Sequence, residues 1–129
     1  MSESYRFDIC PVAASRPRVS KFGHAYFSGP YKAFKERCTG IVPAALGVGF
    51  VPISGRLRVN VECVVTRPKT TKLVTPRGDV DNFAKACLDA LNDRLWEDDK
   101  QIEVLTISKR WADEPGVEGY FEVQIEEIT

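Results

Sequence analysis

Acidic residues gather in one segment of the chain, between positions 79 and 99. This segment holds six aspartates and one glutamate, with Lys85 as an early lysine. Crowded carboxylates repel one another, and the commonest reason for a protein to keep them together is a divalent cation that takes oxygen ligands. The segment therefore predicts a magnesium site.

The spacing of these residues suggests how the site is built. Asp79 and Asp81 are two positions apart, so in extended backbone their side chains point to the same face. Lys85 follows Asp81 by one helical turn and would rise toward the same pocket, where its charge could hold a phosphate. Asp98 and Asp99 lie beyond the far end of the helix, and we expect tertiary packing to bring one of them back. Magnesium usually keeps several waters, so two or three carboxylates suffice.

Simpler explanations of the same residues stay open. Asp79 or Asp81 can act as the N-cap of the helix, where an aspartate is a preferred residue. Lys85 can form a surface ion pair with Asp89, four residues further on. The pair at 98–99 can be an ordinary polar turn. Each explanation leaves the carboxylate without a metal.

Composition limits the classes of protein. A chain of 129 residues with 43% hydrophobic content fits one domain over 1–129. It has no apolar run near the roughly 20 residues of a membrane helix and no signal peptide core, so we expect a soluble, cytoplasmic protein. Four scattered cysteines predict reduced core thiols, and Trp96 is expected in the core. His24 is the only histidine, which disfavours zinc sites and histidine triads, and it fits a loop or packing position.

The net charge of zero conceals a division along the chain. Residues 1–77 hold 13 Lys+Arg and 4 Asp+Glu, whereas residues 78–129 hold 5 and 14, which leaves about +9 and −9. Such polarity suits an enzyme that grips a polyanion with one half and holds cations with the other, although the two halves could simply attract each other. The candidate DNA-binding cations are Arg16, Arg18, Lys21, Arg67, Lys69, Lys72 and Arg77. The last four lie in a proline-punctuated loop that we expect to be mobile.

Hydrophobic periodicity predicts the elements that carry these residues. Alternation of apolar and polar residues predicts strands over 5–9, 57–65 and 120–128, and a mixed pattern predicts another over 102–111. Helical spacing predicts one helix from Pro30, with Ser28 as a cap, and another after Asp81 whose apolar stripe reaches Leu95. Residues 16–27 form a hairpin or an ordered loop, and 39–52 are weakly patterned. The fold class is α+β, with a mixed or antiparallel sheet and two main helices.

Three motifs in order carry a family resemblance. They are Asp79-x-Asp81-Asn82-x-x-Lys85, then Leu88-Asp89-Ala90-Leu91-Asn92, then Trp96-x-Asp98-Asp99-x-Gln101-Ile102. Together they closely resemble the RusA-type Holliday junction resolvases. One departure is that Asp93-Arg94 stands where a glycine is often found.

The resemblance implies a small homodimeric endonuclease that binds four-way DNA junctions and, with magnesium, nicks two opposing strands symmetrically. By motif position, Asp79, Asp81 and Asp99 would be the metal-binding catalytic carboxylates, and Lys85 would assist at the phosphate. Manganese is a possible substitute for magnesium. The implied role is DNA recombination and repair in a bacterial or phage-infected cell.

Two rival hypotheses remain beside the junction resolvase. The first is a less selective structure-specific DNA nuclease that uses the same site. The second is a noncatalytic DNA-binding module, in which the basic half grips phosphates and the acids only cap helices.

Overall fold

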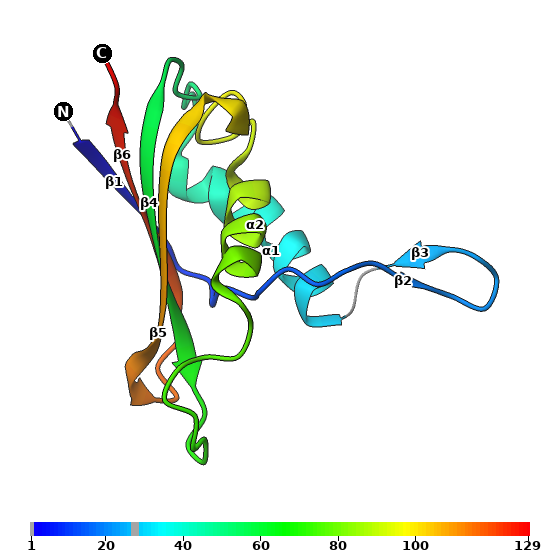
Figure 1. The fold of residues 1–129 in the computed structure, drawn as a ribbon. Coiled ribbons are helices and arrows are strands. Elements are labelled where there is room, and N and C mark those ends of the chain that lie inside the picture. The colour runs from blue at the N-terminus through cyan, green and yellow to red at the C-terminus, as the bar shows by residue number, and fades with distance from the viewer. Residues whose placement is uncertain (1, 27–28) are drawn as a thin grey trace.

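The computed structural model describes residues 2–26 and 29–129, with the side chains of Arg18 and Tyr26 left out. Its elements, in order, are β1 (Ser2–Phe7), β2 (Arg18–Val19), β3 (Ala25–Tyr26), α1 (Gly29–Leu46), β4 (Leu57–Arg67), α2 (Val80–Leu91), a 3₁₀ turn η1 (Asp99–Gln101), β5 (Ile102–Pro115) and β6 (Tyr120–Glu127). The main sheet has the order β1-β6-β4-β5, and both helices cover one of its faces (Figure 1). The predicted α+β fold class is confirmed.

The core lies between the sheet and the two helices. Alternation along β4 buries Leu57, Val59 and Val61 completely on the helix-covered face. Tyr31 and Phe34 of α1 pack against this face, because helical spacing places them on one side of the helix. Trp96 is also fully buried, as expected.

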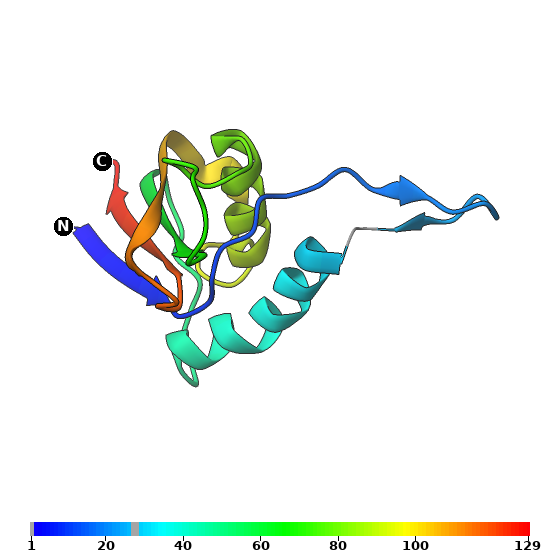
Figure 2. The same cartoon turned by 90° about the horizontal axis from the view of Figure 1, so that it is seen from below.

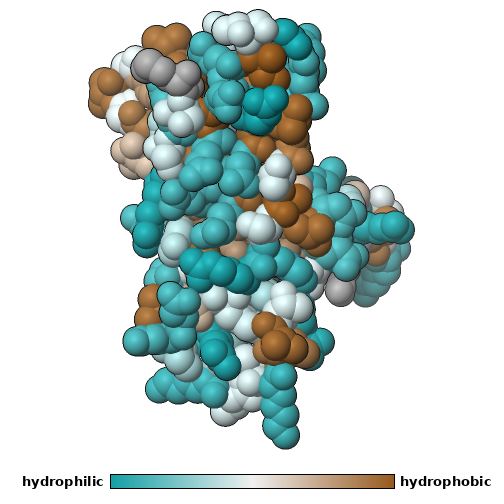
Figure 3. Space-filling model, turned by 60° about the vertical axis from the view of Figure 1, so that its left-hand side comes forward, coloured by the Kyte–Doolittle hydropathy of each residue, from teal (hydrophilic) through white to brown (hydrophobic). Residues whose placement is uncertain are grey.

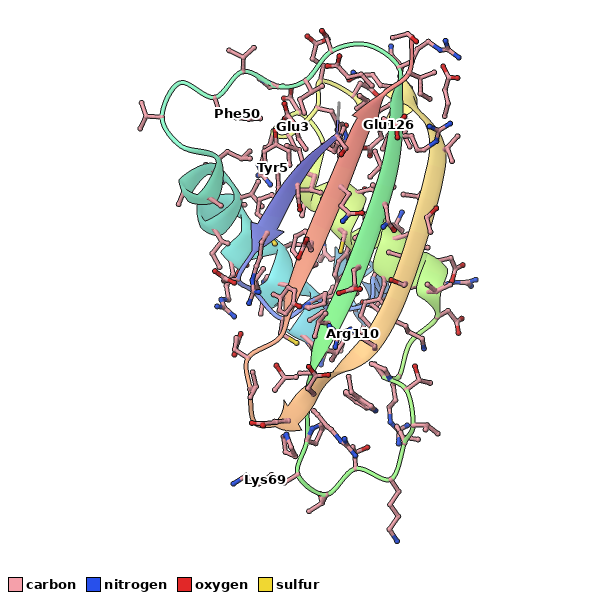
Figure 4. All side chains as sticks on the ribbon, turned by 90° about the vertical axis from the view of Figure 1, so that its left-hand side faces the viewer. Glu3, Tyr5, Phe50, Lys69, Arg110 and Glu126 are labelled. Atoms are coloured by element: carbon pink, nitrogen blue, oxygen red, sulfur yellow. The ribbon has the colours of Figure 1, made fainter. Side chains whose placement is uncertain are left out.

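The opposite face of the sheet is open and largely polar. Arg110 and Glu126 lie on it in Figure 4, and Figure 3 shows hydrophilic residues over much of the same side. Exposed ion pairs cross its strands, such as Arg58 with Glu126 at 3.2 Å. Pairs of this kind add little stability, so the face is held mainly by the core beneath it.

The direction of the strands fixes where α2 begins and ends. β4 pairs with β5 in parallel, whereas β6 pairs with β4 and β1 in antiparallel fashion. A chain that leaves the carboxyl end of β4 must return to its amino end before β5 can start, and α2 makes this return. The first turn of α2 therefore lies at the carboxyl ends of the two strands, and its last turn at their amino ends.

Residues 18–26 form a hairpin that extends away from the sheet and helices (Figures 1 and 2). Its tip is closed by Ser20, whose Oγ accepts hydrogen bonds from the backbone N–H of Phe22 and His24. Gly23 supplies the positive φ of 82° that the turn needs. Of the two alternatives left open for this segment, the structure forms the hairpin.

Several predicted boundaries differ from the structure. β1 ends at Phe7, and Ile9 is buried in the loop after it. α1 continues through Pro43 to Leu46, into the weakly patterned stretch. α2 ends at Leu91, so Leu95 is buried from the following turn rather than from the helix. Ser28, the expected cap, lies outside the described residues.

The turn after α2 explains the missing glycine. Asp93 has a φ of 63°, the left-handed conformation that glycine adopts most easily and that aspartate tolerates. The cysteines agree with the prediction: all four are free thiols, and Cys38, Cys63 and Cys87 are buried.

Candidate active site

Asp79 stands at the start of α2 with an uncommitted carboxylate. It is the N-cap residue by position, with extended backbone (φ −77°, ψ 146°), and its carbonyl accepts from the N–H of Asn82 and of Phe83 at 3.0 and 3.2 Å. Its side chain makes no capping hydrogen bond, and the residue is exposed. The capping explanation therefore does not engage the carboxylate, which stays available for a ligand.

Asp81 lies in the first turn of α2, not in extended backbone as we expected. The same-face argument for Asp79 and Asp81 therefore rested on the wrong conformation. The argument for Lys85 holds, since both residues are helical, one turn apart and exposed. Among the described residues, no ion pair of Lys85 with Asp89 or another carboxylate falls within 4.0 Å. Asp89 instead accepts a long hydrogen bond of 3.5 Å from the Tyr31 hydroxyl.

Close packing fixes the residue just before Asp79. Gly78 has a φ of 99°, and a Cβ placed on it would lie 2.8 Å from the Cβ of Ala13 and 3.2 Å from Cε2 of Phe83. The backbone N–H of Ala14 also donates to the carbonyl of Asn82 at 2.9 Å. The segment that leads to the hairpin is thus fastened to the first turn of α2.

The basic loop, residues 67–78, is hydrogen-bonded to β5 in its second half, and the mobility that we expect of it stays a prediction. Trp111 of β5 donates its Nε1–H to the Leu73 carbonyl at 2.9 Å. Lys109, two residues earlier, donates from Nζ to the Pro76 and Gly78 carbonyls at 2.7 and 2.6 Å. Sequence reasoning missed both residues, because they are read as ordinary members of a strand and their partners are more than 30 residues away.

The two aspartates after α2 have different surroundings. Asp98 is the N-cap of η1: its Oδ1 accepts from the Lys100 N–H at 2.9 Å, and its own N–H donates to Oε1 of Gln101 at 2.7 Å. Asp99 is half-buried and accepts a 2.6 Å hydrogen bond from Nε1 of Trp96 at Oδ1. The polar-turn explanation thus accounts for Asp98, whose side chain works as a cap.

Burial raises the pKa of the Asp99 carboxyl above its ordinary value. The nearby charges of Asp89 and Asp98 raise this pKa further, whereas the hydrogen bond from Trp96 lowers it. Burial and the neighbouring negative charges both make the ionised carboxylate less stable. A bound cation opposes both effects, so it stabilises such a carboxylate more than an exposed one. A cation bound beside Asp99 would therefore favour the ionised form of its carboxyl.

The structure does not bring Asp99 to Asp79 and Asp81 within one chain. α2 lies between them, and a helix of 12 residues spans roughly 18 Å. Among the described residues, no group of three or more histidine, cysteine, aspartate or glutamate side chains is placed to hold a metal ion. Our expectation that packing returns an aspartate to the start of the helix is wrong for the single chain, because the parallel strands force the helix to carry them apart.

The candidate DNA-binding cations divide between two segments. Arg67, Lys69, Lys72 and Arg77 are all exposed in the basic loop, which precedes Asp79 directly. Arg16 and Lys21 are exposed along the hairpin segment, and Arg18 lies in β2. A hollow of about 430 Å³ lies between the basic loop and β5, and Arg110, which lines it, pairs with Glu62 at 3.5 Å and with Asp113 at 3.4 Å.

In the described part of the chain, no helix has the length and apolar character needed to span a bilayer. The family model described as endodeoxyribonuclease RusA matches residues 8–126. The uncharacterized protein YqaN of Bacillus subtilis (strain 168) is 31% identical over 134 aligned residues, which cover 92% of this chain and 92% of that protein.

Proposed function

This chain belongs to the RusA family of endodeoxyribonucleases, and on that premise we propose that it resolves four-way DNA junctions by magnesium-dependent paired nicks. One observation carries the proposal: Asp79 and Asp81 present exposed carboxylates beside Lys85, directly after a loop of four exposed cations. Among the described residues, the Asp79 carboxylate makes no capping hydrogen bond and Lys85 has no ion pair within 4.0 Å. These groups are available for a substrate phosphate and its cation.

The donor set fits magnesium, which prefers carboxylate and water oxygens and rarely takes all its ligands from protein. Asp79, Asp81 and Asp99 would hold the ion, and manganese suits the same ligands. When bound, the ion would supply an activated water and neutralise charge on the phosphate. Lys85 would hold a phosphate oxygen from its position one turn after Asp81. The basic loop would grip the backbone on the approach to Asp79.

The separation of the carboxylates supports a homodimer. Asp99 lies about one helix length from Asp79 and Asp81, so it can join them at one metal only if it comes from a second copy of the chain. A twofold dimer then contains two identical sites, each made from both chains. Two sites related by a twofold axis match two nicks placed symmetrically on opposing strands. The proposed place of action is the cytoplasm of a bacterial or phage-infected cell.

The test compares strand cleavage of a four-way junction, a fork, a linear duplex and a single strand at one salt concentration, with magnesium titrated from zero. We expect magnesium-dependent nicks in the junction alone, at symmetric positions. Equal cleavage of all four substrates would favour the less selective nuclease. Junction binding without cleavage, with manganese as well as magnesium, would favour the noncatalytic module.

A further inference from the structure

Lys109 contacts the turn that sets the position of Asp79, although it belongs to a different element. Its Nζ donates to the Pro76 carbonyl at 2.7 Å and to the Gly78 carbonyl at 2.6 Å. Gly78 is the residue directly before Asp79. An ammonium has three N–H donors, so two of the three are committed to this turn.

The two hydrogen bonds act on a turn that is already confined by close packing. Gly78 has no room for a Cβ because Ala13 and Phe83 lie against it. Charge-assisted hydrogen bonds are short and among the stronger ones in proteins. The turn is thus both packed against apolar atoms and bound to an ammonium, which leaves the backbone into Asp79 little freedom.

Other roles account for Lys109 less well. Among the described residues, no carboxylate lies within 4.0 Å of its Nζ, so it is not part of an ion pair. It is half-buried, unlike the exposed cations of the basic loop. A residue whose purpose was to contact DNA would keep its donors directed to solvent.

We propose that Lys109 is a positioning residue for the metal site: it holds the turn at 76–78 so that the Asp79 carboxylate stays in place for a divalent cation. Trp111 extends the same connection, since its Nε1 holds Leu73 in the basic loop. β5 therefore keeps the phosphate-gripping loop and the first metal ligand in a fixed relation. This inference rests on the proposed metal site, and it assigns no contact between Lys109 and the substrate.

The experiment measures Mn²⁺ binding by the loss of the free-ion signal in electron paramagnetic resonance, without DNA. Lys109→Met removes both hydrogen bonds and keeps an unbranched side chain that is one atom shorter. We expect Mn²⁺ affinity to fall about 10-fold or more, the usual effect of losing a group that orients a metal ligand. Lys109→Arg, which keeps donors and charge, should recover part of that loss. Lys32→Met removes an exposed lysine from α1 and should leave Mn²⁺ affinity unchanged.

A second measurement separates positioning from general stability. Amide hydrogen exchange of residues 76–82 should quicken in Lys109→Met, while exchange in the β4 core stays as in the wild type. In nicking assays the same variant should need more magnesium for half-maximal rate, and its junction affinity in calcium should not change.

Unaltered Mn²⁺ affinity in Lys109→Met would overturn the proposal. So would an equal loss in Lys32→Met, or faster exchange throughout the core. If the wild type binds no Mn²⁺, both the proposed metal site and the proposed role of Lys109 are wrong. If the wild type binds Mn²⁺ and nicks no DNA, only the proposed nuclease function fails, and the Mn²⁺ comparison still decides on Lys109.

Discussion

Individual aspartates in the acidic segment differ in what already occupies their oxygens. Asp79 and Asp81 are exposed at the start of α2, and Asp79 makes no capping bond. Asp98 caps the start of η1 with its side chain. Asp99 is half-buried and bound to Trp96. Residue type and spacing singled out these carboxylates as candidates, but their hydrogen-bond partners come from the fold.

Replacing Asp81 with asparagine tests the metal hypothesis at one residue. Asp81→Asn keeps the size of the side chain and removes the charge that a divalent cation requires. We expect nicking to fall by about 100-fold or more, as when one electrostatic group is lost from a catalytic site, while junction affinity persists. Asp93→Asn removes a charge from the same segment at a position with no proposed ligand role, and it should retain activity. Equal activity in wild type and Asp81→Asn would contradict the metal hypothesis.

The raised pKa of Asp99 predicts how the stability of the metal-free protein depends on pH. Between the ordinary pKa of 3.8 and the raised pKa, the folded state binds more protons than the unfolded state. Stability therefore falls as pH rises through this interval. Asp99→Asn keeps an oxygen for the Trp96 hydrogen bond, so thermal melts in EDTA should show a smaller loss from pH 4 to 7 and a higher Tm at neutral pH. A lower Tm for Asp99→Asn at every pH would contradict the assignment.

At the scale of elements, the sequence predicted what depends on local pattern. The alternation in β4 predicted a strand over 57–65, and the observed strand is two residues longer, ending at Arg67. The sequence did not predict the last turns of α1, because Pro43 and the small residues near it lack a helical stripe. It also could not predict the parallel pairing of β4 with β5, or the hold of Lys109 and Trp111 on the basic loop. These depend on contacts between residues far apart in the chain.

The basic loop should contribute to DNA affinity through phosphate contacts. Replacing Lys69 and Lys72 with alanine removes two exposed cations, and each phosphate contact releases counterions when it forms. We expect the slope of log K against log salt to become shallower by about 2. Junction affinity measured between 50 and 200 mM salt gives the slope. Lys32 and Arg37 of α1, both exposed, make a matched control pair, and an equal change for the two pairs would indicate a nonspecific effect of net charge.

The turn before Asp79 should tolerate no side chain at position 78. Gly78→Ala adds a Cβ that meets Ala13 at 2.8 Å, and it also places alanine at a φ of 99°. We expect a loss of about 1–3 kcal/mol in the free energy of unfolding, measured by urea denaturation. Gly55→Ala is the control, since Gly55 has a φ of 91° but open space around it. If both variants lose the same amount, the packing against Ala13 has no effect of its own.

At the scale of the whole molecule, the two basic segments are fastened to different elements. The segment before the hairpin is held to the first turn of α2 by the bond from Ala14 to Asn82, and the basic loop is held to β5 by Lys109. The division of charge seen along the sequence therefore becomes a spatial arrangement in which the basic loop leads directly into Asp79, whereas the hairpin that carries Lys21 extends away from the sheet and the helices (Figures 1 and 2).

Mixing two inactive variants tests whether each site is shared between chains. In a dimer of one Asp81→Asn chain and one Asp99→Asn chain, a shared arrangement puts both substitutions in one site and leaves the other intact. We expect the mixture to nick one strand of a junction, whereas either variant alone nicks none. Denaturing gels of junctions labelled on each strand give the result. Sites contained within single chains would leave the mixture inactive.

The length of α2 has a further consequence if the sites are shared. A single chain carries the ligands of one metal at opposite ends of the helix and has no complete nuclease of its own. Cutting then requires an encounter between two copies, and in dilute solution the rate of DNA damage would fall with the square of the protein concentration. A cell that makes little of the protein would then be protected without an inhibitor. At low concentration few chains would dimerise, and a single chain cannot form a complete site because α2 separates its ligands.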